Sequence, residues 1–166
     1  MSGGELEADF RQAMRRLAAS VHVVATRCEG RRYGMTATAV TSLSMAPPSL
    51  LVCVNQRAAT HAALARPGQL FSVNLLTPAQ QAVANLFGMP AEDGDTRFAA
   101  GGWEEAAEGV PILAGAASAV LCEVDALYPH TSHTIVVGRV LRVGLGDQPA
   151  ALIYADGKFA GARQCN

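Results

Sequence analysis

The stretch Leu50-Leu-Val-Cys-Val54 is apolar at every position and predicts a strand that is buried on both faces. Segments of similar texture recur on both sides of it. They are rich in Val, Ile, Thr and Leu and are separated by Gly, Pro or charged turns. These predicted strands are Val21–Thr26, Met35–Ser44, Leu50–Asn55, Leu70–Leu75, Ala117–Tyr128, His133–Leu145 and a short last one, Ala151–Tyr154. So many strands with few helices favour an antiparallel barrel over a parallel sheet.

Three segments are predicted to be helices. In the first, apolar residues recur with helical spacing at Leu6, Phe10, Ala13, Met14 and Leu17. The second, Thr60–Arg66, is short and ends at Pro67-Gly68. The third, Pro78–Phe87, has Thr77 as N-cap and Gln80 to complete a capping box. The segment after it, Pro90–Gly109, is rich in Gly and acidic residues, and we expect a loop with up to one turn of helix there, either mobile or functional.

The composition is that of one folded domain spanning residues 1–166. Half of the residues are hydrophobic and the formal net charge is −1, which excludes disorder and favours self-association. Without a basic excess we expect no nucleic-acid partner, and without an apolar run of about 18 residues we expect no membrane span. The acidic start lacks the features of a signal peptide, and the four cysteines form no C-x-x-C pair, so we predict a cytoplasmic protein.

Several motifs of known chemistry are absent from the sequence. It has neither G-x-G-x-x-G nor G-x-x-x-x-G-K-[ST], so neither a Rossmann site nor a P-loop is supported. It also lacks the G-x-S-x-G elbow of the α/β-hydrolases. His130 and His133 bracket a short turn, but zinc sites need three or four protein ligands, so we expect no metal site.

One run of residues has the character of a ligand-binding strand. Gly34-Met-Thr-Ala-Thr-Ala-Val-Thr-Ser-Leu-Ser44 combines small residues with hydroxyl groups, so a planar ligand can lie close to its backbone. An edge strand with hydroxyls facing water explains the same pattern equally well. Further on, Arg57 precedes the helix start at Thr60, where free N–H groups and a positive charge suit a phosphate. An ordinary capped helix with a surface arginine is the alternative.

These segments together resemble the short-chain flavin reductases, which are the NAD(P)H:flavin oxidoreductase components of two-component flavin monooxygenases. The resemblance covers nearly the whole chain in order. It rests on Phe10-x-x-Ala-Met-Arg-Arg-Leu-Ala, Gly34-Met-Thr-Ala, Thr41-Ser-Leu-Ser-Met-Ala-Pro-Pro-Ser-Leu-Leu-Val-Cys-Val-Asn55, Thr60-His-Ala-Ala-Leu64, Phe71-Ser-Val-Asn-Leu-Leu76, Arg97-Phe98, Trp103, Gly109-Val-Pro-Ile-Leu113, Leu121-Cys-Glu-Val, His133-Thr-Ile-Val-Val-Gly-Arg-Val140 and Leu152-Ile-Tyr154.

The resemblance implies a mainly β fold: an antiparallel Greek-key split β-barrel that binds FMN or FAD, with a few short helices. It also implies a homodimer, with the flavin near the subunit boundary. The implied reaction is hydride transfer from NADH or NADPH to the flavin, and reduced flavin then passes to a partner monooxygenase. Two alternatives remain open, namely a passive flavin carrier and a reductase that acts on another bound substrate.

Site residues are carried over position by position. The cofactor-binding residues implied by the family are Tyr33, Gly34, Met35, Thr36, Thr38, Ala39, Cys53, Val54, Asn55, Arg57, Ala59, Thr60 and Phe87. His133 and Tyr154 match positions associated with the nicotinamide face and are the catalytic candidates. Many relatives have serines where this chain has Ala58 and Ala59, so the phosphate contact would depend on Arg57, Thr60 and backbone N–H groups.

Overall fold

The computed structural model describes residues 3–90, 94–106 and 108–162. Within these residues the protein is mainly β, with a few helices. The elements are α1 (Gly3–Arg15), β1 (Ala19–Ser20), β2 (His22–Cys28), β3 (Arg31–Ala37), β4 (Val40–Met45), β5 (Pro48–Asn55), α2 (Ala59–Leu64), β6 (Leu70–Leu75), a 3-10 turn (Pro78–Gln80), α3 (Gln81–Gly88), a second 3-10 helix (Gly94–Ala99), β7 (Trp103–Glu105), β8 (Pro111–Leu113), β9 (Ser118–His130), β10 (His133–Leu145), β11 (Leu152–Ala155) and β12 (Lys158–Gly161).

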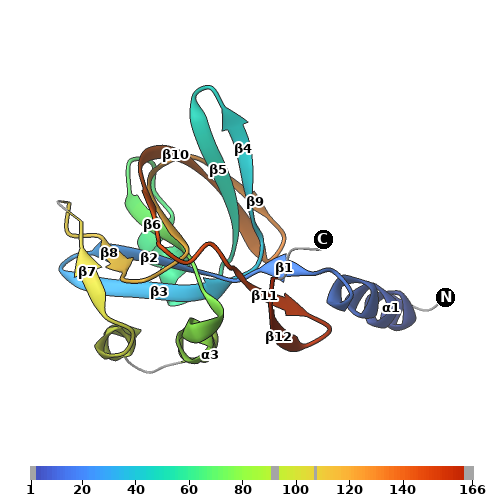
Figure 1. Cartoon of the computed structure of the whole chain (residues 1–166). Coiled ribbons are helices and arrows are strands. Elements are labelled where there is room, and N and C mark those ends of the chain that lie inside the picture. The colour runs from blue at the N-terminus through green and yellow to red at the C-terminus, as the bar shows by residue number, and fades with distance from the viewer. Residues whose placement is uncertain (1–2, 91–93, 107, 163–166) are drawn as a thin grey trace.

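The main sheet is antiparallel throughout and has the strand order β3-β2-β6-β9-β10-β5-β4. Its strands curve around a common interior (Figure 1). The predicted barrel is not closed, because β3 and β4 are unpaired edges at the two ends of this order. Two smaller sheets, β1-β11-β12 and β7-β8, complete the β structure.

The predicted single strand Met35–Ser44 is two strands. The chain leaves β3 after Ala37 and begins β4 at Val40, so the first half pairs with β2 and the second with β5. The link carries the chain from one edge of the sheet to the other, and the Cys53 N–H donates to the Ala39 carbonyl at 3.0 Å. The run of small residues allows this break, which period-2 patterning does not reveal.

Strand β2 is buried on both faces and separates two hydrophobic cores. Val24 belongs to the core inside the curved sheet, which also contains Phe71 and Val136. Val23 and Ala25 belong to a second core between the sheet and α3. Because alternate side chains of a strand point to opposite faces, one continuous apolar run serves both cores.

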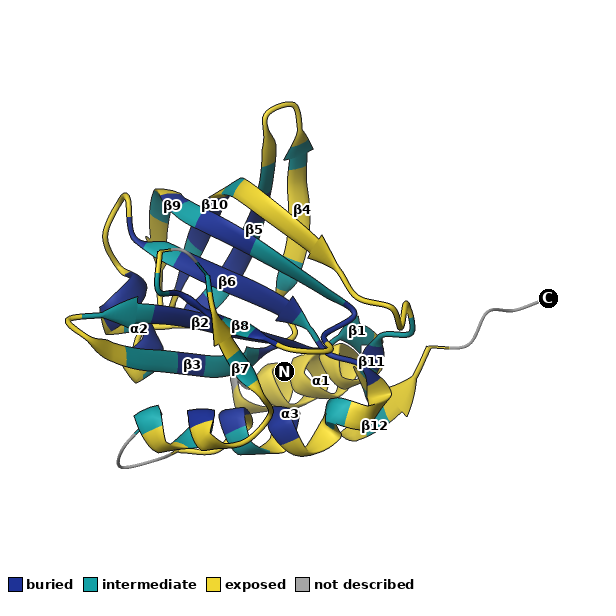
Figure 2. Cartoon of the chain, turned by 60° about the vertical axis from the view of Figure 1, so that its left-hand side comes forward, coloured by how far each residue is buried: buried dark blue, intermediate teal, exposed yellow. Residues whose placement is uncertain are grey.

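The helices differ in how they are held. The predicted capping box is present before α3, where the Thr77 N–H donates to the Gln80 side-chain oxygen at 3.1 Å. Helix α2 places Leu64 in the interior core. In contrast, α1 is exposed along its length (Figure 2), and Phe10 is 62% exposed although the apolar stripe was correctly predicted to be helical. In the part of the chain that is described, no helix has the length and hydropathy to span a membrane.

Within Pro90–Gly109 the second 3-10 helix stands where one helical turn was predicted, and the short strand β7 was not predicted. Residues 91–93 and 107 lie outside the described residues. The 3-10 helix is tied to β3 by a bidentate ion pair. Arg32 Nε and Nη2 donate to the Asp95 carboxylate at 2.8 and 3.1 Å, and the Arg32 backbone N–H donates at 3.1 Å. These bonds hold the pKa of Asp95 down, at about 2. The 3-10 helix is thereby fixed against the β3 edge of the main sheet.

Candidate functional site

A cavity of about 530 Å³ opens where the edge strand β3 faces the loop between β5 and α2. Its volume lies in the range of small-molecule sites. Its lining residues are Tyr33, Gly34, Met35, Thr36, Asn55, Arg57, Ala58, Ala59, Thr60, Phe87, Gly88, Met89, Pro90, Gly94 and Arg97. Among these described residues both formal charges are arginines, so the cavity favours an anionic ligand.

The edge of β3 offers backbone hydrogen-bonding groups to this cavity. The Arg32 N–H faces away from β2, since it donates to Asp95, and the Gly34 carbonyl accepts from Arg97 Nη1 at 3.4 Å. In an antiparallel strand the backbone groups of alternate residues face the same side, so those of Thr36 also face outward. The Thr36 side chain is held in place by its 2.7 Å hydrogen bond to the Ala84 carbonyl in α3.

Gly34 allows an aromatic ring to pack directly beneath the cavity floor. A Cβ atom at this position would lie 2.7 Å from Cε1 of Phe87 and 3.1 Å from Cζ of Phe98. The Phe87 ring is only 2% exposed and packs on Phe98 and Trp103 at centroid distances of 5.0 and 5.2 Å. Phe87 therefore supports the cavity floor from below, as part of the second core between the sheet and α3.

The opposite side of the cavity is built at the end of β5. Asn55 accepts a hydrogen bond from the Arg57 N–H at 2.9 Å, which turns the chain into α2. Thr60 is 3% exposed, and the first N–H groups of a helix have no partner within it. The turn is anchored to β10, because Gln56 Nε2 donates to the His133 carbonyl at 3.1 Å and His61 Nε2 lies 2.9 Å from Thr134 Oγ1.

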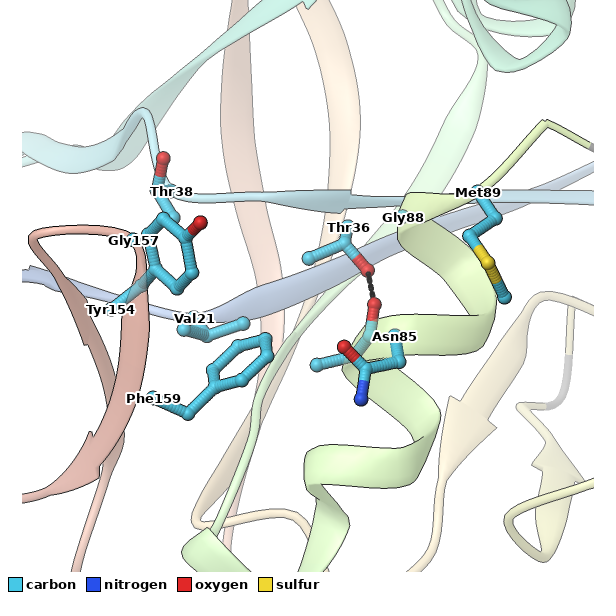
Figure 3. A pocket seen from close by; sticks show the side chains of 10 residues that line it. Val21, Thr36, Thr38, Asn85, Gly88, Met89, Tyr154, Gly157 and Phe159 are labelled. Atoms are coloured by element: carbon cyan, nitrogen blue, oxygen red, sulfur yellow. Dashed lines mark hydrogen bonds between the residues drawn. The ribbon is translucent and has the colours of Figure 1, made fainter. Parts of the chain in front are cut away.

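A second cavity, of about 360 Å³, adjoins the first and shares Thr36, Gly88 and Met89 with it. Figure 3 shows Tyr154 and Phe159 on one side of this cavity and α3 on the other, with Thr36 between them. The two rings pack edge to face with centroids 5.1 Å apart. The pair of cavities thus forms one site with two compartments, an arrangement that suits two ligands in contact.

The comparisons with known proteins agree with this geometry. The family model described as "Flavin reductase like domain" matches residues 14–163. This chain belongs to the flavin reductase family. The resemblance predicted from the sequence is therefore confirmed.

Members of this flavin reductase family with named activities align along nearly the whole chain. An "FMN reductase (NADH)" of Methylorubrum extorquens is 41% identical, over 92% of this chain and 75% of its own. The reductase component of an "FADH(2)-dependent resorcinol hydroxylase" from a Rhizobium species is 38% identical, over 93% and 86%. The structure of BorF, flavin reductase component of a bacterial two-component tryptophan halogenase, superimposes with a TM-score of 0.86, 34% identity and 96% and 99% coverage.

In this flavin reductase, the site residues expected from the sequence lie in different places. Nine line the main cavity: Tyr33, Gly34, Met35, Thr36, Asn55, Arg57, Ala59, Thr60 and Phe87. Thr38 and Tyr154 line the second cavity. Ala39, Cys53, Val54 and His133 line neither. Val54 is fully buried in the interior core, whereas Ala39 contacts β5 through its carbonyl.

His133 lies at the start of β10, directly opposite Asn55. Opposed residues of paired strands share one face, so its side chain is on the same outer face as that of Asn55. It is exposed, and its Nδ1 lies 2.9 Å from Ser132 Oγ. His133 is thus beside the main cavity without lining it. Among the described residues there is no group of three or more potential metal ligands.

The sequence analysis missed Arg97 as a candidate site residue. Its guanidinium contacts the carbonyls of Gly34, Phe87 and Met89, so it joins β3 to the end of α3. Met89 and Gly88 line both cavities. The only sequence signals were the Arg97-Phe98 motif and the unusual length of Pro90–Gly109, and neither specifies a contact.

Proposed function

We propose that this protein transfers hydride from NADH or NADPH to FMN or FAD and supplies reduced flavin to a partner monooxygenase. The observation that carries the proposal is the main cavity, which joins an open strand edge to an arginine and a buried threonine. The backbone groups of the open strand edge suit the polar rim of a planar ring, and the arginine and threonine suit a phosphate. A flavin bound there would supply the redox chemistry, and the protein would supply orientation. Family membership and the names of the relatives support the same activity.

The cavity walls suggest how the chain would hold the flavin. The edge of β3 from Tyr33 to Thr36, continued by Thr38 and Ala39, would contact the ring and ribityl chain. The end of β5, Cys53 to Asn55, would extend this wall through its backbone. Arg57, Ala59 and Thr60 would contact the phosphate. Phe87 would act from beneath Gly34, because its buried ring fixes the floor on which the flavin lies.

The nicotinamide would occupy the second cavity, against the first. Tyr154 lines that cavity, and its ring is fixed by Phe159. His133, beside Asn55 on the outer face of β10, would orient the part of the nicotinamide cofactor that extends across the main cavity. The redox step needs no protein acid, so binding and alignment account for the role of both residues.

We also propose that the chain folds as one split-barrel domain with Greek-key connections. We further propose that the protein is cytoplasmic and forms a homodimer. A second copy would cover apolar surface that a monomer leaves in water. This surface includes the α1 stripe and exposed side chains of β9 and β10, where Tyr128 and Val143 are 59% and 55% exposed. Light scattering should give twice the chain mass. Phe10→Glu should shift it toward one chain mass, and an unchanged dimer would show that α1 is not at the interface.

The central test separates flavin binding from hydride delivery. Titration with FMN and FAD should quench flavin fluorescence at micromolar protein, which corresponds to roughly 8 kcal/mol. Anaerobic NADH or NADPH should then bleach the flavin in a stopped-flow instrument. Flavin that binds but is not bleached would indicate a passive carrier, and no binding at millimolar flavin would refute the proposal.

Two sets of variants should separate flavin binding from flavin reduction, because each should impair only one of the two. Arg57→Ala combined with Thr60→Ala should weaken flavin binding tenfold or more, because charge-assisted hydrogen bonds contribute roughly 1.5–3 kcal/mol. The bleaching rate at saturating flavin should change little. His133→Ala should instead raise the apparent KM for NADH or slow bleaching, with flavin affinity intact. Arg16→Ala, which removes one exposed charge from outside both cavities, is the control. If His133→Ala bleaches flavin as fast as the parent at every NADH concentration, its proposed role is wrong.

A further inference from the structure

The guanidinium of Arg97 is held at the wall of the main cavity. Its Nη1 donates to the carbonyl of Gly34 at 3.4 Å and to that of Phe87 at 3.5 Å, and Nη2 donates to the Met89 carbonyl. The residue is half-buried and lines the cavity. An arginine on an open surface samples many rotamers, so these three contacts fix the position of the charge before a ligand binds.

The positive charge of Arg97 is not neutralised by the described walls of the cavity. Backbone carbonyls carry only partial charges, and the described lining residues include no Asp or Glu. Asp95, two residues earlier in the chain, pairs with Arg32, whose Nε and Nη2 donate to its carboxylate at 2.8 and 3.1 Å. Arginine stays protonated in proteins, so Arg97 brings a full positive charge to this wall.

The contact with Gly34 also changes what the β3 edge offers to a ligand. Backbone groups of Gly34 and Thr36 face outward from the sheet at the cavity. The Gly34 carbonyl already accepts from Arg97, whereas the N–H of the same residue is a donor on the same side. Next to Gly34 the wall therefore combines an N–H donor with a cation. Such a wall favours a ligand rim that carries negative charge.

Hydride transfer creates negative charge on the ring that this wall would contact. The C4–H bond of the reduced nicotinamide breaks, the N5–H bond of the flavin forms, and both electrons of the hydride enter the flavin ring. The flavin ring, neutral before, then carries one negative charge, and the nicotinamide ring becomes a cation. On the basis of the function proposed above, we propose that Arg97 makes the main cavity bind reduced flavin more tightly than oxidised flavin. The same preference speeds hydride transfer, because it grows as the charge develops.

The first experiment measures this preference as a reduction potential. A tenfold tighter binding of reduced FMN raises the midpoint potential of bound FMN by about 30 mV relative to free FMN. In mildly alkaline buffer the parent protein should raise it by at least that amount, since charge-assisted hydrogen bonds change affinity by roughly tenfold or more. Arg97→Gln keeps a donor for the carbonyls but removes the charge. It should lower the potential of bound FMN by about 30 mV and leave the Kd for oxidised FMN within about twofold of the parent value.

Matched variants separate the charge of Arg97 from its contacts. Arg97→Lys keeps the charge and should recover most of the shift in potential. Arg142→Gln removes a charge from an exposed position on β10, outside both cavities, and should behave like the parent. Bleaching by NADH at saturating flavin should slow about twofold to tenfold in Arg97→Gln.

Three results would overturn the role of Arg97 and leave hydride transfer as proposed. They are a parental potential in Arg97→Gln, an equal loss of affinity for both forms of FMN in that variant, and a shift of the same size in Arg142→Gln. The second would show that Arg97 only shapes the cavity. A parent protein that binds neither form of FMN would overturn both this role and the proposed function.

Discussion

Gly34→Ala tests the contact between the floor of the main cavity, the proposed flavin site, and the core beneath it. The new methyl carbon would lie 2.7 and 2.9 Å from Cε1 and Cδ1 of Phe87. Real Cβ atoms do not approach other atoms so closely, so the ring or the strand must move. The ring has little freedom, because it is 2% exposed and contacts Phe98 and Trp103.

The cost should be that of an overpacked core, about 1–3 kcal/mol in the free energy of unfolding. For a chain of this length this corresponds to a Tm lower by about 2–12 °C. Flavin affinity should fall as well, because the displaced ring lies directly under the cavity. Gly88→Ala is the matched control: it changes another glycine of the same cavity, but its Cβ would meet Thr36 only at 3.8 Å. It should leave the free energy of unfolding nearly unchanged.

Urea unfolding and flavin titration should be measured on Gly34→Ala and Gly88→Ala. The same measurements should be made on Phe87→Leu and on the double variant Gly34→Ala/Phe87→Leu. Removing ring atoms relieves the collision, so Gly34→Ala should cost less in the Phe87→Leu background. The coupling between the two substitutions should be at least about 0.5 kcal/mol. Additive effects, or a Gly34→Ala protein as stable as the parent, would refute the argument that glycine is needed here to admit the Phe87 ring.

Three further expectations concern the rest of the fold. The lowered pKa of Asp95, about 2, means that its pair with Arg32 contributes stability above the ordinary carboxyl pKa and loses it as pH falls from about 4 to about 2. Asp95→Asn should therefore flatten that part of the pH–stability curve, by at most about 1 kcal/mol because solvent screens this partly exposed pair. Burial raises the pKa of the Cys122 thiol to about 12, so mass spectrometry should find it unalkylated at pH 8 until the protein unfolds; rapid labelling of the native state would contradict this. Gly138→Ala should destabilise the protein by about 1–3 kcal/mol in urea unfolding, since its Cβ would lie 2.5 Å from the buried Phe71 ring, and a neutral effect would show that β10 can shift locally.

Elements whose signal is local could be read from the sequence. The strand Leu70–Leu75 and the long strand His133–Leu145 have the predicted bounds, because their ends coincide with Gly, Pro or turn residues. The capping box at Thr77 is also as predicted, since it needs only residues three apart. The cysteines Cys28, Cys53 and Cys122 form no disulfide among the described residues, and Cys165 lies outside them.

Elements that depend on distant partners were missed or misread. β1, β7 and β12 are too short to show a pattern, and they exist because β11 and β8 pair with them. The break between β3 and β4 was missed for the same reason. Both halves of Met35–Ser44 have strand-like composition, and only the positions of β2 and β5 decide which strand each half joins.

The sequence by itself determined which residues have the hydrogen-bonding capacity and charge that the proposed flavin site needs: the glycine and hydroxyl groups around Thr36, the arginine at position 57 and the threonine at position 60. Tertiary structure alone decided which of them share a cavity. It brought the edge of β3 opposite the end of β5, added Arg97 and Met89 from a segment without a clear motif, and left Val54 in the core. The physical reason is that hydrogen-bonding capacity, charge and strand propensity belong to each residue and its neighbours. A cavity instead results from long-range pairing and packing, whose register the local pattern does not encode.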